Sequence, residues 1–436
     1  MTTATAPLEL RRQLGLGALV MLVVGEVIGV GIFLTPAQMI RSLGSPFWLL
    51  VVWLAMGLMA LTGALCYGAL AARFPQAGGG YIYLREGWGQ AAAFLYGWKC
   101  LFVLDPGLTA AFGVGLASYA TYVHPLAPLW QKLLAIGAIV ALGGVNCLGV
   151  RLGAGFTRWL ALLKLALLLL LIGWGVVRGL GDWSHFSPFV AQRAGSAPLR
   201  LALGTGLLSA FFSFAGWWDA AKLAGEARDP GRSVPRALVL GVTIVTAVYL
   251  LTTAAFVYLV PFEQVTSGEA FAAQAGQALF GTAGATVFSA VVMVCVLGSL
   301  ASFTTAAPRV YYAMGRDGLF LRSVGRVHRR FGTPVRAILI QVLLASLLVA
   351  LGSFDQIVAY FVFVTVLFVA LTVAATLRLS LGFRVPALVF LGFAAVLLFL
   401  LASSNPLQAL LGTAVVALGW PVYRLVFASS RAPLAR

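Results

Sequence analysis

Long apolar runs alternate with short polar segments along almost the whole chain. About twelve of these runs are long enough to cross a bilayer, because a membrane helix needs about 20 mostly apolar residues. The predicted spans cover residues 14–40, 46–73, 91–122, 128–148, 156–178, 199–222, 236–260, 281–312, 335–352, 356–378, 386–402 and 407–428. Several runs exceed the usual length, which a tilted helix accommodates. The pattern predicts an all-α integral membrane protein with twelve transmembrane helices.

The first run contains a glycine pattern that does not suit an uninterrupted helix. Gly25 and Gly29 have the spacing of a close-packing helix face. Gly29 and Gly31, however, flank a single residue in the middle of the run, and glycine permits backbone angles that other residues avoid. Unpaired backbone groups at membrane depth are tolerated only where they line a cavity or are buried in protein. We therefore favour a broken first helix over a simple packing face.

A second interruption falls in the sixth run, where Ser213, Gly216 and Asp219 break an apolar sequence. This run holds the same place in a second set of five spans as the first run holds in the first set. Paired interruptions in corresponding spans are typical of secondary transporters built from inverted repeats. The predicted organisation is a tail (1–13), a first repeat (14–178), a second repeat (199–378), a final pair of spans (386–428) and a second tail (429–436).

Composition and charge agree with a membrane protein. The chain is 61% hydrophobic and only 9% charged, a balance that excludes a soluble globular domain. Its net charge of +17 comes mainly from arginines in the loops on one side of the twelve-span arrangement. The other side holds few basic residues: Lys132, Arg178, Arg193 and Arg200, with Arg41 near an edge. The positive-inside rule therefore places both termini in the cytoplasm of a cell-membrane protein, and no nucleic-acid partner is expected.

The sequence offers little to support catalysis or a bound cofactor. The four cysteines lie in apolar runs without metal-type spacing, and the three histidines lie in or beside loops. The glycine-rich segment 75–86 lacks the Lys-Ser/Thr pair of a phosphate-binding loop. We expect no metal and no cofactor, and a membrane-embedded enzyme is disfavoured. A channel remains an alternative that its conduction rate would distinguish from a carrier.

Five motifs follow one another along residues 15–380. They are residues 24–33 (VGEVIGVGIF), 75–83, 212–217 (FSFAGW), 225–238, and 309–318 followed by Thr333-Pro334. In this order the motifs resemble those of the amino acid–polyamine–organocation superfamily, and of its bacterial L-amino-acid-transporter-like branch in particular. The resemblance implies a five-plus-five inverted repeat with broken first and sixth helices, and amino acid transport by alternating access. Two positions differ from the family pattern: Val30 often corresponds to Ser or Ala, and Glu26 usually corresponds to an uncharged residue.

The two interruptions are the predicted substrate site. The expected binding residues are Val27, Ile28, Gly29, Val30 and Gly31 in the first span and Phe212, Ser213, Phe214, Ala215 and Gly216 in the sixth. A zwitterion would place its carboxylate at the positive end of the half-helix that starts near Gly29–Gly31. Its ammonium would meet unpaired carbonyls near Val27 and Ile28 and along residues 212–215. We expect a small or neutral L-amino acid; a cationic amino acid or polyamine, with Glu26 or Asp219 as counter-charge, is the alternative.

Ionisable residues at membrane depth are expensive and mark candidate functional sites. Lys164 could extend its ammonium to the interface; the resemblance instead implies that it occupies the place of a coupling sodium ion, bonded to carbonyls of the first span. We expect Glu26 to pair with Lys164, with a cationic substrate or a proton as alternative partners. Lys99 and Asp105 are expected to be structural. The coupled species, a proton or a counter-exchanged amino acid, stays open.

The resemblance also assigns a role to Phe212, beside the small residues Ser213 and Ala215. It implies that this ring is an aromatic gate that closes over a bound substrate. The alternative is an ordinary core phenylalanine, one of the 29 in the chain.

Overall fold

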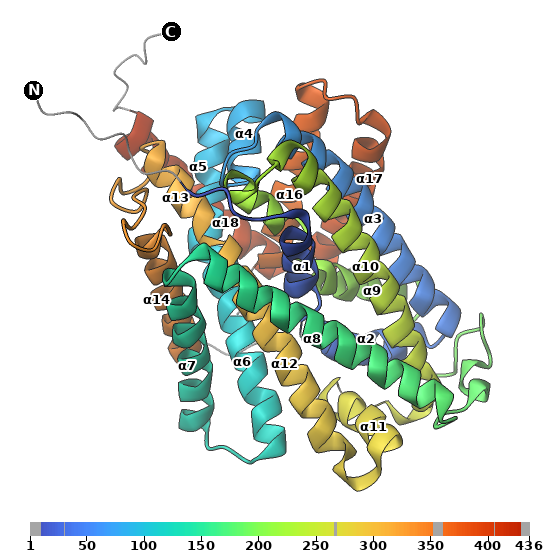
Figure 1. Ribbon diagram of the computed structural model, residues 1–436. Coiled ribbons are helices and arrows are strands. Elements are labelled where there is room, and N and C mark those ends of the chain that lie inside the picture. The colour runs from blue at the N-terminus through green and yellow to red at the C-terminus, as the bar shows by residue number, and fades with distance from the viewer. Residues whose placement is uncertain (1–9, 30, 266–267, 352–360, 405, 429–436) are drawn as a thin grey trace, which may run out of the picture.

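The protein is described by a computed structural model that covers residues 10–29, 31–265, 268–351, 361–404 and 406–428. Val30, one of the predicted binding residues, lies outside the described residues. Figure 1 shows strongly tilted helices, with α4 and α13 at the upper end of the molecule and α11 at the lower end.

Most of the described chain is helical. Its α-helices are α1 (Leu16–Val27), α2 (Gly31–Leu43), α3 (Pro46–Arg73), α4 (Gly80–Trp88), α5 (Gln90–Lys99), α6 (Asp105–Val123), α7 (Pro128–Cys147), α8 (Val150–Val177), α9 (Leu199–Phe214), α10 (Pro230–Leu259), α11 (Gly268–Phe280), α12 (Gly284–Ala306), α13 (Pro308–Arg316), α14 (Val335–Leu351), α16 (Phe361–Arg378), α17 (Arg384–Ser404) and α18 (Pro406–Val422). Short 3₁₀ segments cover Trp183–Phe186, Asp219–Glu226, Phe262–Gln264 and Gly281–Ala283, and π turns cover Cys100–Leu104 and Tyr423–Ala428.

Within the described residues, nine helical stretches are long and apolar enough to cross a membrane. Three shorter apolar helices, Leu16–Val27, Val335–Leu351 and Val362–Arg378, accompany them. These stretches coincide with the predicted apolar runs, so the all-helical, multi-pass membrane architecture is confirmed. That all twelve runs cross the bilayer stays a prediction.

The backbone leaves the helical conformation at both places where the glycine pattern predicts an interruption. α1 ends at Val27 and α2 begins at Gly31. α9 ends at Phe214, and an extended Ala215 and a left-handed Gly216 (φ 104°) precede the 3₁₀ segment Asp219–Glu226. Only glycine adopts the Gly216 conformation without strain. The first and sixth apolar runs are therefore each divided into two shorter helical pieces.

The third run is one continuous helical stretch, Gln90–Thr121, as its hydropathy predicts, but it contains a π turn near its middle. α5 and α6 are joined by the π turn Cys100–Leu104, in which the Asp105 N–H donates to the Cys100 carbonyl five residues earlier. Pro106 follows directly and has no N–H to donate, so regular α-helical bonding is already lost at this point. π turns of this kind are frequent at functional sites.

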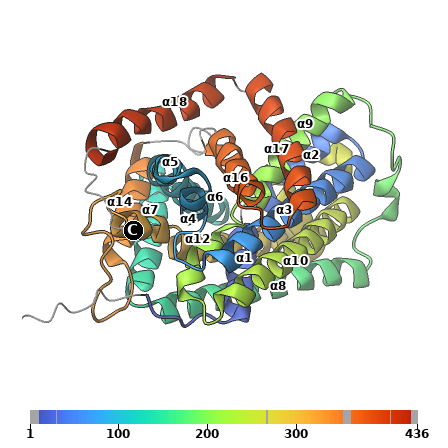
Figure 2. The same ribbon diagram turned by 90° about the horizontal axis from the view of Figure 1, so that it is seen from above.

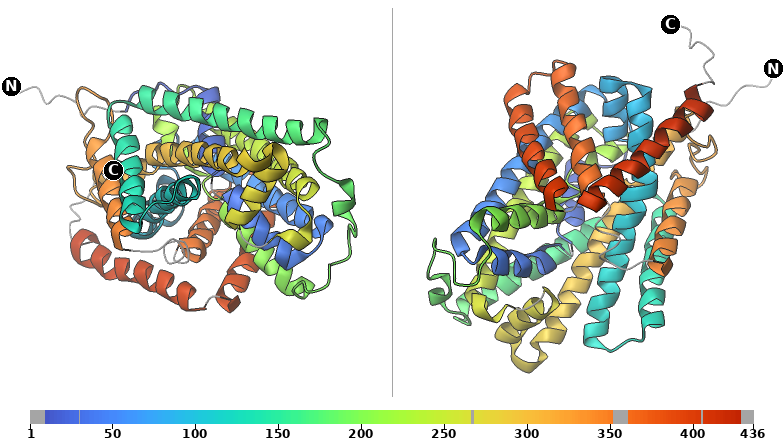
Figure 3. Two further views of the ribbon diagram at one scale, coloured as in Figure 1. Left: turned by 90° about the horizontal axis from the view of Figure 1, so that it is seen from below. Right: turned by 180° about the vertical axis from the view of Figure 1, so that it is seen from behind.

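The interrupted helices lie at the centre of the bundle. α1 packs against α8, α10 and α12, whereas α2 packs against α9. Seen from above, α17 and α18 run along one edge, away from α1 and α8 (Figure 2). Seen from behind, α18 crosses the molecule obliquely (Figure 3) and packs against α5 and α16. The two last helices thus flank the bundle, and the interrupted helices lie inside it.

Candidate functional site

The two interruptions touch each other. A Cβ on Gly31 would lie 2.8 Å from the Ser213 Cα, so only glycine allows α2 and α9 to approach this closely. Thr35 and Ser213 share a hydrogen bond of 2.8 Å between their hydroxyls. Tyr249 of α10 places its hydroxyl 2.7 Å from the Val27 carbonyl and 2.7 Å from the Ser213 carbonyl. The structure therefore brings the two predicted halves of the site together.

Lys164 of α8 lies behind the first interruption. Its side chain is fully buried, so the alternative in which it extends to the interface is wrong. The ammonium donates to the Gly25 carbonyl (2.5 Å), to the Ile28 carbonyl, and to the Ser299 hydroxyl (3.2 Å). The Ser299 hydroxyl lies 3.0 Å from each of the same two carbonyls. One ammonium and one hydroxyl thus satisfy backbone groups that the interruption frees.

The expected pairing of Glu26 with Lys164 is wrong. No ion pair joins these two residues, both of which the structure describes. Successive residues of a helix point about 100° apart, so positions 25 and 26 face different neighbouring helices or segments. A Cβ on Gly25 would meet Ser302 and Ala161 of α12 and α8, whereas a Cβ on Gly216 would lie 2.7 Å from Glu26 Oε1. Glu26 therefore faces the sixth-span interruption, away from Lys164.

Asp219 and Asp105 are held by a lysine that sequence reasoning missed. Lys222 Nζ lies 2.8 Å from Asp219 Oδ2 and 3.7 Å from Asp105 Oδ1, and all three side chains are buried. The Tyr311 hydroxyl donates to Asp105 Oδ2 at 2.8 Å. The three-residue spacing of Asp219 and Lys222, which puts both on one helical face, is the signal that could have identified this pair.

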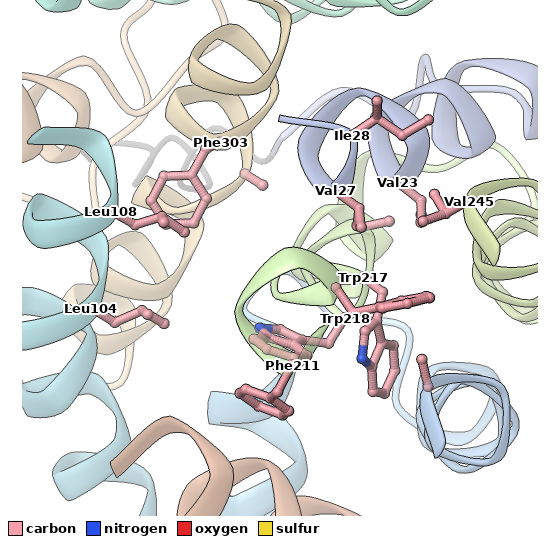
Figure 4. Close-up of a cluster of buried hydrophobic side chains, with 14 of the residues drawn as sticks. Val23, Val27, Ile28, Leu104, Leu108, Phe211, Trp217, Trp218, Val245 and Phe303 are labelled. Carbon is pink, nitrogen blue, oxygen red and sulfur yellow. The ribbon is translucent and has the colours of Figure 1, made fainter. Parts of the chain in front are cut away.

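Aromatic side chains surround the sixth-span interruption. Figure 4 shows Trp217 and Trp218 beside Val27, with Phe303 on the facing helix. Phe211 stacks on Trp218, with a centroid distance of 6.4 Å and an interplanar angle of 28°. Phe211, Trp217 and Trp218, with residues of α3 and with Phe390 of α17, enclose a space of about 10 Å³, about the size of one water molecule. The space beside the sixth-span interruption is therefore too small for an amino acid in this conformation.

The predicted binding residues differ in what they present. Phe214 is buried against Trp53 and Tyr249, whereas Phe212 and Ala215 are half-buried. The Ser213 hydroxyl donates to the Ser209 carbonyl.

The backbone groups expected to bind the substrate ammonium are already engaged. The Val27 carbonyl receives the Gly29 N–H at 2.8 Å and lies beside the Tyr249 hydroxyl, and the Ile28 carbonyl receives the Lys164 ammonium. The expectation that both carbonyls are unpaired is therefore wrong. By contrast, the first N–H groups of α2 have no partner within their own helix, which leaves the predicted carboxylate position in place.

The end of the bundle that holds α4 and α13 contains a larger cavity, of about 430 Å³. It is lined by Leu10, Arg12, Pro75, Gln76, Ala77, Ile82, Arg85, Gly225, Tyr312, Ala313, Arg316 and Asp317. Beside it, buried Arg309 pairs with Glu226 at 2.7 Å, and the Glu226 carbonyl accepts the N–H groups of Gln13 and Leu14. Hydropathy gave no indication of this cavity, since it forms between four separate segments.

Comparison with known proteins identifies the family. The profile of the family described as "Amino acid permease" matches residues 14–430. The serine/threonine exchanger SteT of Bacillus subtilis is 29% identical over 363 residues, which are 82% of this chain and 81% of that protein.

Two mammalian transporters are similarly related. The human b(0,+)-type amino acid transporter 1 is 28% identical over 376 residues, covering 84% of this chain and 75% of that protein. The rat large neutral amino acids transporter small subunit 2 is 28% identical over an alignment that covers 95% of this chain and 81% of that protein. The chain therefore belongs to the amino acid permease family, as a multi-pass amino acid transporter and not an enzyme.

Proposed function

We propose that this protein moves small or neutral L-amino acids across the cell membrane by alternating access, without sodium. The observation that carries the proposal is the buried Lys164 ammonium at the carbonyls of Gly25 and Ile28. With Ser299 Oγ and the Cys295 carbonyl (3.4 Å), its neighbours are all oxygen atoms. Such a set suits a monovalent cation, and here a tethered ammonium fills it. The charge that a sodium ion would bring is therefore part of the chain.

The proposed architecture is a five-plus-five inverted repeat of twelve spans, with residues 14–178 and 199–378 as the repeats. It is supported by two interruptions that hold corresponding places in the two halves. One separates α1 from α2, and the other separates α9 from the segment Asp219–Glu226. Under alternating access, one end of the site is closed at a time. In this structure the space beside the sixth-span interruption is only about 10 Å³, and the larger cavity lies at the end with α4 and α13.

A small or neutral substrate is supported by the N-terminus of α2 and by the pairing of Asp219. The N-terminus of α2 offers free N–H groups and a positive dipole end to a carboxylate. Asp219 is paired with Lys222 at 2.8 Å, which argues against its use as a counter-charge. The relatives are named as a serine/threonine exchanger and a large neutral amino acids transporter, which favours a neutral substrate, and the first of these names favours exchange.

A cationic amino acid or polyamine is the second candidate, because Glu26 Oε1 is buried without a hydrogen-bond partner. Both candidates are separated by one assay. Uptake of radiolabelled serine by purified protein in liposomes would be measured while unlabelled amino acids are added outside. The liposomes would be prepared with and without amino acid inside. We expect neutral amino acids to compete and internal substrate to raise the rate. Competition only by lysine, arginine or putrescine would favour the second candidate, and a rate equal to that of empty liposomes would contradict both.

Topology is a separate expectation, which follows from the arginine distribution. In a background without Cys66, Cys100, Cys147 and Cys295, a cysteine at the exposed Ser187 should react with an impermeant maleimide in intact cells. One at Ser323 should react only after the membrane is opened. Labelling of position 323 in intact cells would place the termini outside.

The gate proposed at Phe212 makes a distinct prediction. Phe212→Leu keeps an apolar side chain but shortens its reach, so exchange should fall by about fivefold or more while equilibrium binding of substrate changes little. Phe214→Leu is the matched control, because this buried ring contacts Trp53 and Tyr249; it should lose about 1–2 kcal/mol of stability instead. Parent-like exchange by Phe212→Leu would show that the ring is an ordinary core residue.

A further inference from the structure

Three carboxyl groups are buried together between the interruptions and the end of the bundle that holds α13. Glu26 lies on α1, Asp105 begins α6, and Asp219 begins the 3₁₀ segment, with side chains no more than 2% exposed. One oxygen of each has no hydrogen-bond partner: Glu26 Oε1, Asp105 Oδ1 and Asp219 Oδ1. Buried polar atoms are normally satisfied, so these three oxygens are each able to accept a hydrogen bond from a further donor.

The cations around this cluster do not balance its acids. Lys222 contacts Asp219 and Asp105, which it cannot neutralise together. Lys99 is also buried, with its ammonium 4.8 Å from the centroid of the Tyr96 ring. The region thus holds two buried ammonium groups and three buried carboxyl groups, so one negative charge is left over. Other titratable groups near the cluster are Tyr67 of α3, Tyr96 of α5, Cys100 of the π turn and Tyr311 of α13, all neutral when protonated.

The excess charge is located at Glu26. The Glu26 carboxyl group lies against the turn that leads into Asp219: a Cβ on Gly216 would be 2.7 Å from Glu26 Oε1, and the Gly216 carbonyl accepts the Asp219 N–H at 2.9 Å. Neither lysine forms an ion pair with Glu26 among the described contacts. A hydrogen bond between two carboxyl groups requires that one of them carries a proton, as in pairs of carboxyl groups that share a site. The acidic side chains of the cluster are not gathered in the way that metal ligands are, within the described part of the chain.

We propose that Glu26 and Asp219 form a proton-binding site, in which one proton is shared between the two carboxyl groups. This inference rests on the proposed function and adds the ion to which transport responds. The two residues belong to the two movable pieces, α1 and the segment Asp219–Glu226, so their contact exists only while these pieces are together. Gly225, in the same segment, lines the 430 Å³ cavity.

The proton step follows from this arrangement. When α1 and the segment separate, water from the cavity reaches the pair, the carboxyl O–H bond breaks, and the proton passes to water. Two carboxylates remain, and their mutual repulsion keeps the pieces apart until a proton returns. Closure at this end therefore requires proton uptake, and a higher pH at this side slows the cycle.

The experiment measures serine exchange in liposomes as a function of internal pH. For the parent we expect the rate to fall with rising pH, by no more than about tenfold per pH unit if one proton is taken up. Glu26→Gln keeps a hydrogen-bonding group but cannot release a proton, so its rate should vary less than about twofold over the same range. Glu263→Gln is the control, because its side chain is 66% exposed at a surface pair with Arg193; its profile should match the parent. A pH-dependent Glu26→Gln profile identical to that of the parent overturns the proposal.

A second measurement does not depend on transport. Infrared spectra of the purified parent near neutral pH should contain the carbonyl band of a protonated carboxylic acid, which Glu26→Gln should lack. Absence of this band in the parent overturns the proton site even if amino acids are transported. Failure of transport with the band present contradicts the proposed function alone. Binding of putrescine to the parent that Glu26→Gln abolishes would assign Glu26 as a counter-charge and overturn the proton site.

Discussion

Lys164→Ala is expected to lower amino acid exchange by about tenfold or more in a transporter that still reaches the membrane. The substitution removes the ammonium from the carbonyls of Gly25 and Ile28. Each buried carbonyl left with fewer donors costs about 1–3 kcal/mol, and the backbone between Val27 and Gly31 loses the contact that fixes it. Exchange by the parent should be the same when sodium is replaced by choline. A steep sodium dependence of the parent would contradict the proposed role of this ammonium.

Two further variants separate charge from packing at this position. Lys164→Met keeps the length of the side chain and removes the charge, so it should be as impaired as Lys164→Ala. Lys132→Ala removes an exposed ammonium that contacts the Ala350 carbonyl at 2.7 Å, and its exchange should equal that of the parent. If Lys164→Met is fully active, the ammonium has no role in transport.

Arg309→Ala should produce the largest loss of stability. Arg309 is 1% exposed, and its partner Glu226 lies at 2.7 Å with a fully buried carboxylate. Removing one partner of a buried pair leaves an uncompensated charge, which costs about 3–5 kcal/mol. The Glu226 backbone also holds Gln13 and Leu14, so the N-terminal segment should loosen at the same time. Thermal unfolding in detergent, with tryptophan fluorescence as the signal, measures the effect.

A double variant that combines Glu226→Gln with Arg309→Met tests the cause of this loss. It removes both charges together and should recover a large part of the stability that Arg309→Ala loses. Arg336→Ala is the control, since Arg336 contacts the Ser323 carbonyl at an exposed position. Equal unfolding temperatures for the parent and Arg309→Ala would show that the buried pair carries no stability.

Local patterns in the sequence were sufficient for the general architecture. Hydrophobic run length predicts the helices, and Gly29, Gly31 and Gly216 mark where helices stop, because backbone freedom is a property of the residue itself. The resemblance located Lys164 at the first interruption, and the structure places it there. What the resemblance implies about coupling and gating remains a prediction.

The partners of buried charges could not be predicted in the same way. Which residue faces Glu26 depends on how α1 is rotated against its neighbours, and hydropathy does not encode that rotation. Lys222 follows an interrupted helix, so its direction depends on backbone angles that no propensity specifies. Tyr249 lies in a mostly apolar span, and nothing in the local sequence distinguishes it from a core aromatic. Its deciding contacts join distant segments, since even the nearer partner, Ser213, is 36 positions away in the sequence.

Tyr249 has a consequence for how the two halves of the site are connected. A phenolic hydroxyl carries a single hydrogen, yet it lies equally close to the carbonyls of Val27 and Ser213. At any instant only one of these oxygens receives that hydrogen, and the other has a lone pair directed at an oxygen that is not donating to it. Whether the Val27 carbonyl receives the Tyr249 hydrogen therefore depends on whether the Ser213 carbonyl does, although the two carbonyls belong to different halves of the site. If another donor, such as the ammonium of an amino acid, bonds to one of these carbonyls, the Tyr249 hydroxyl can donate its hydrogen to the other.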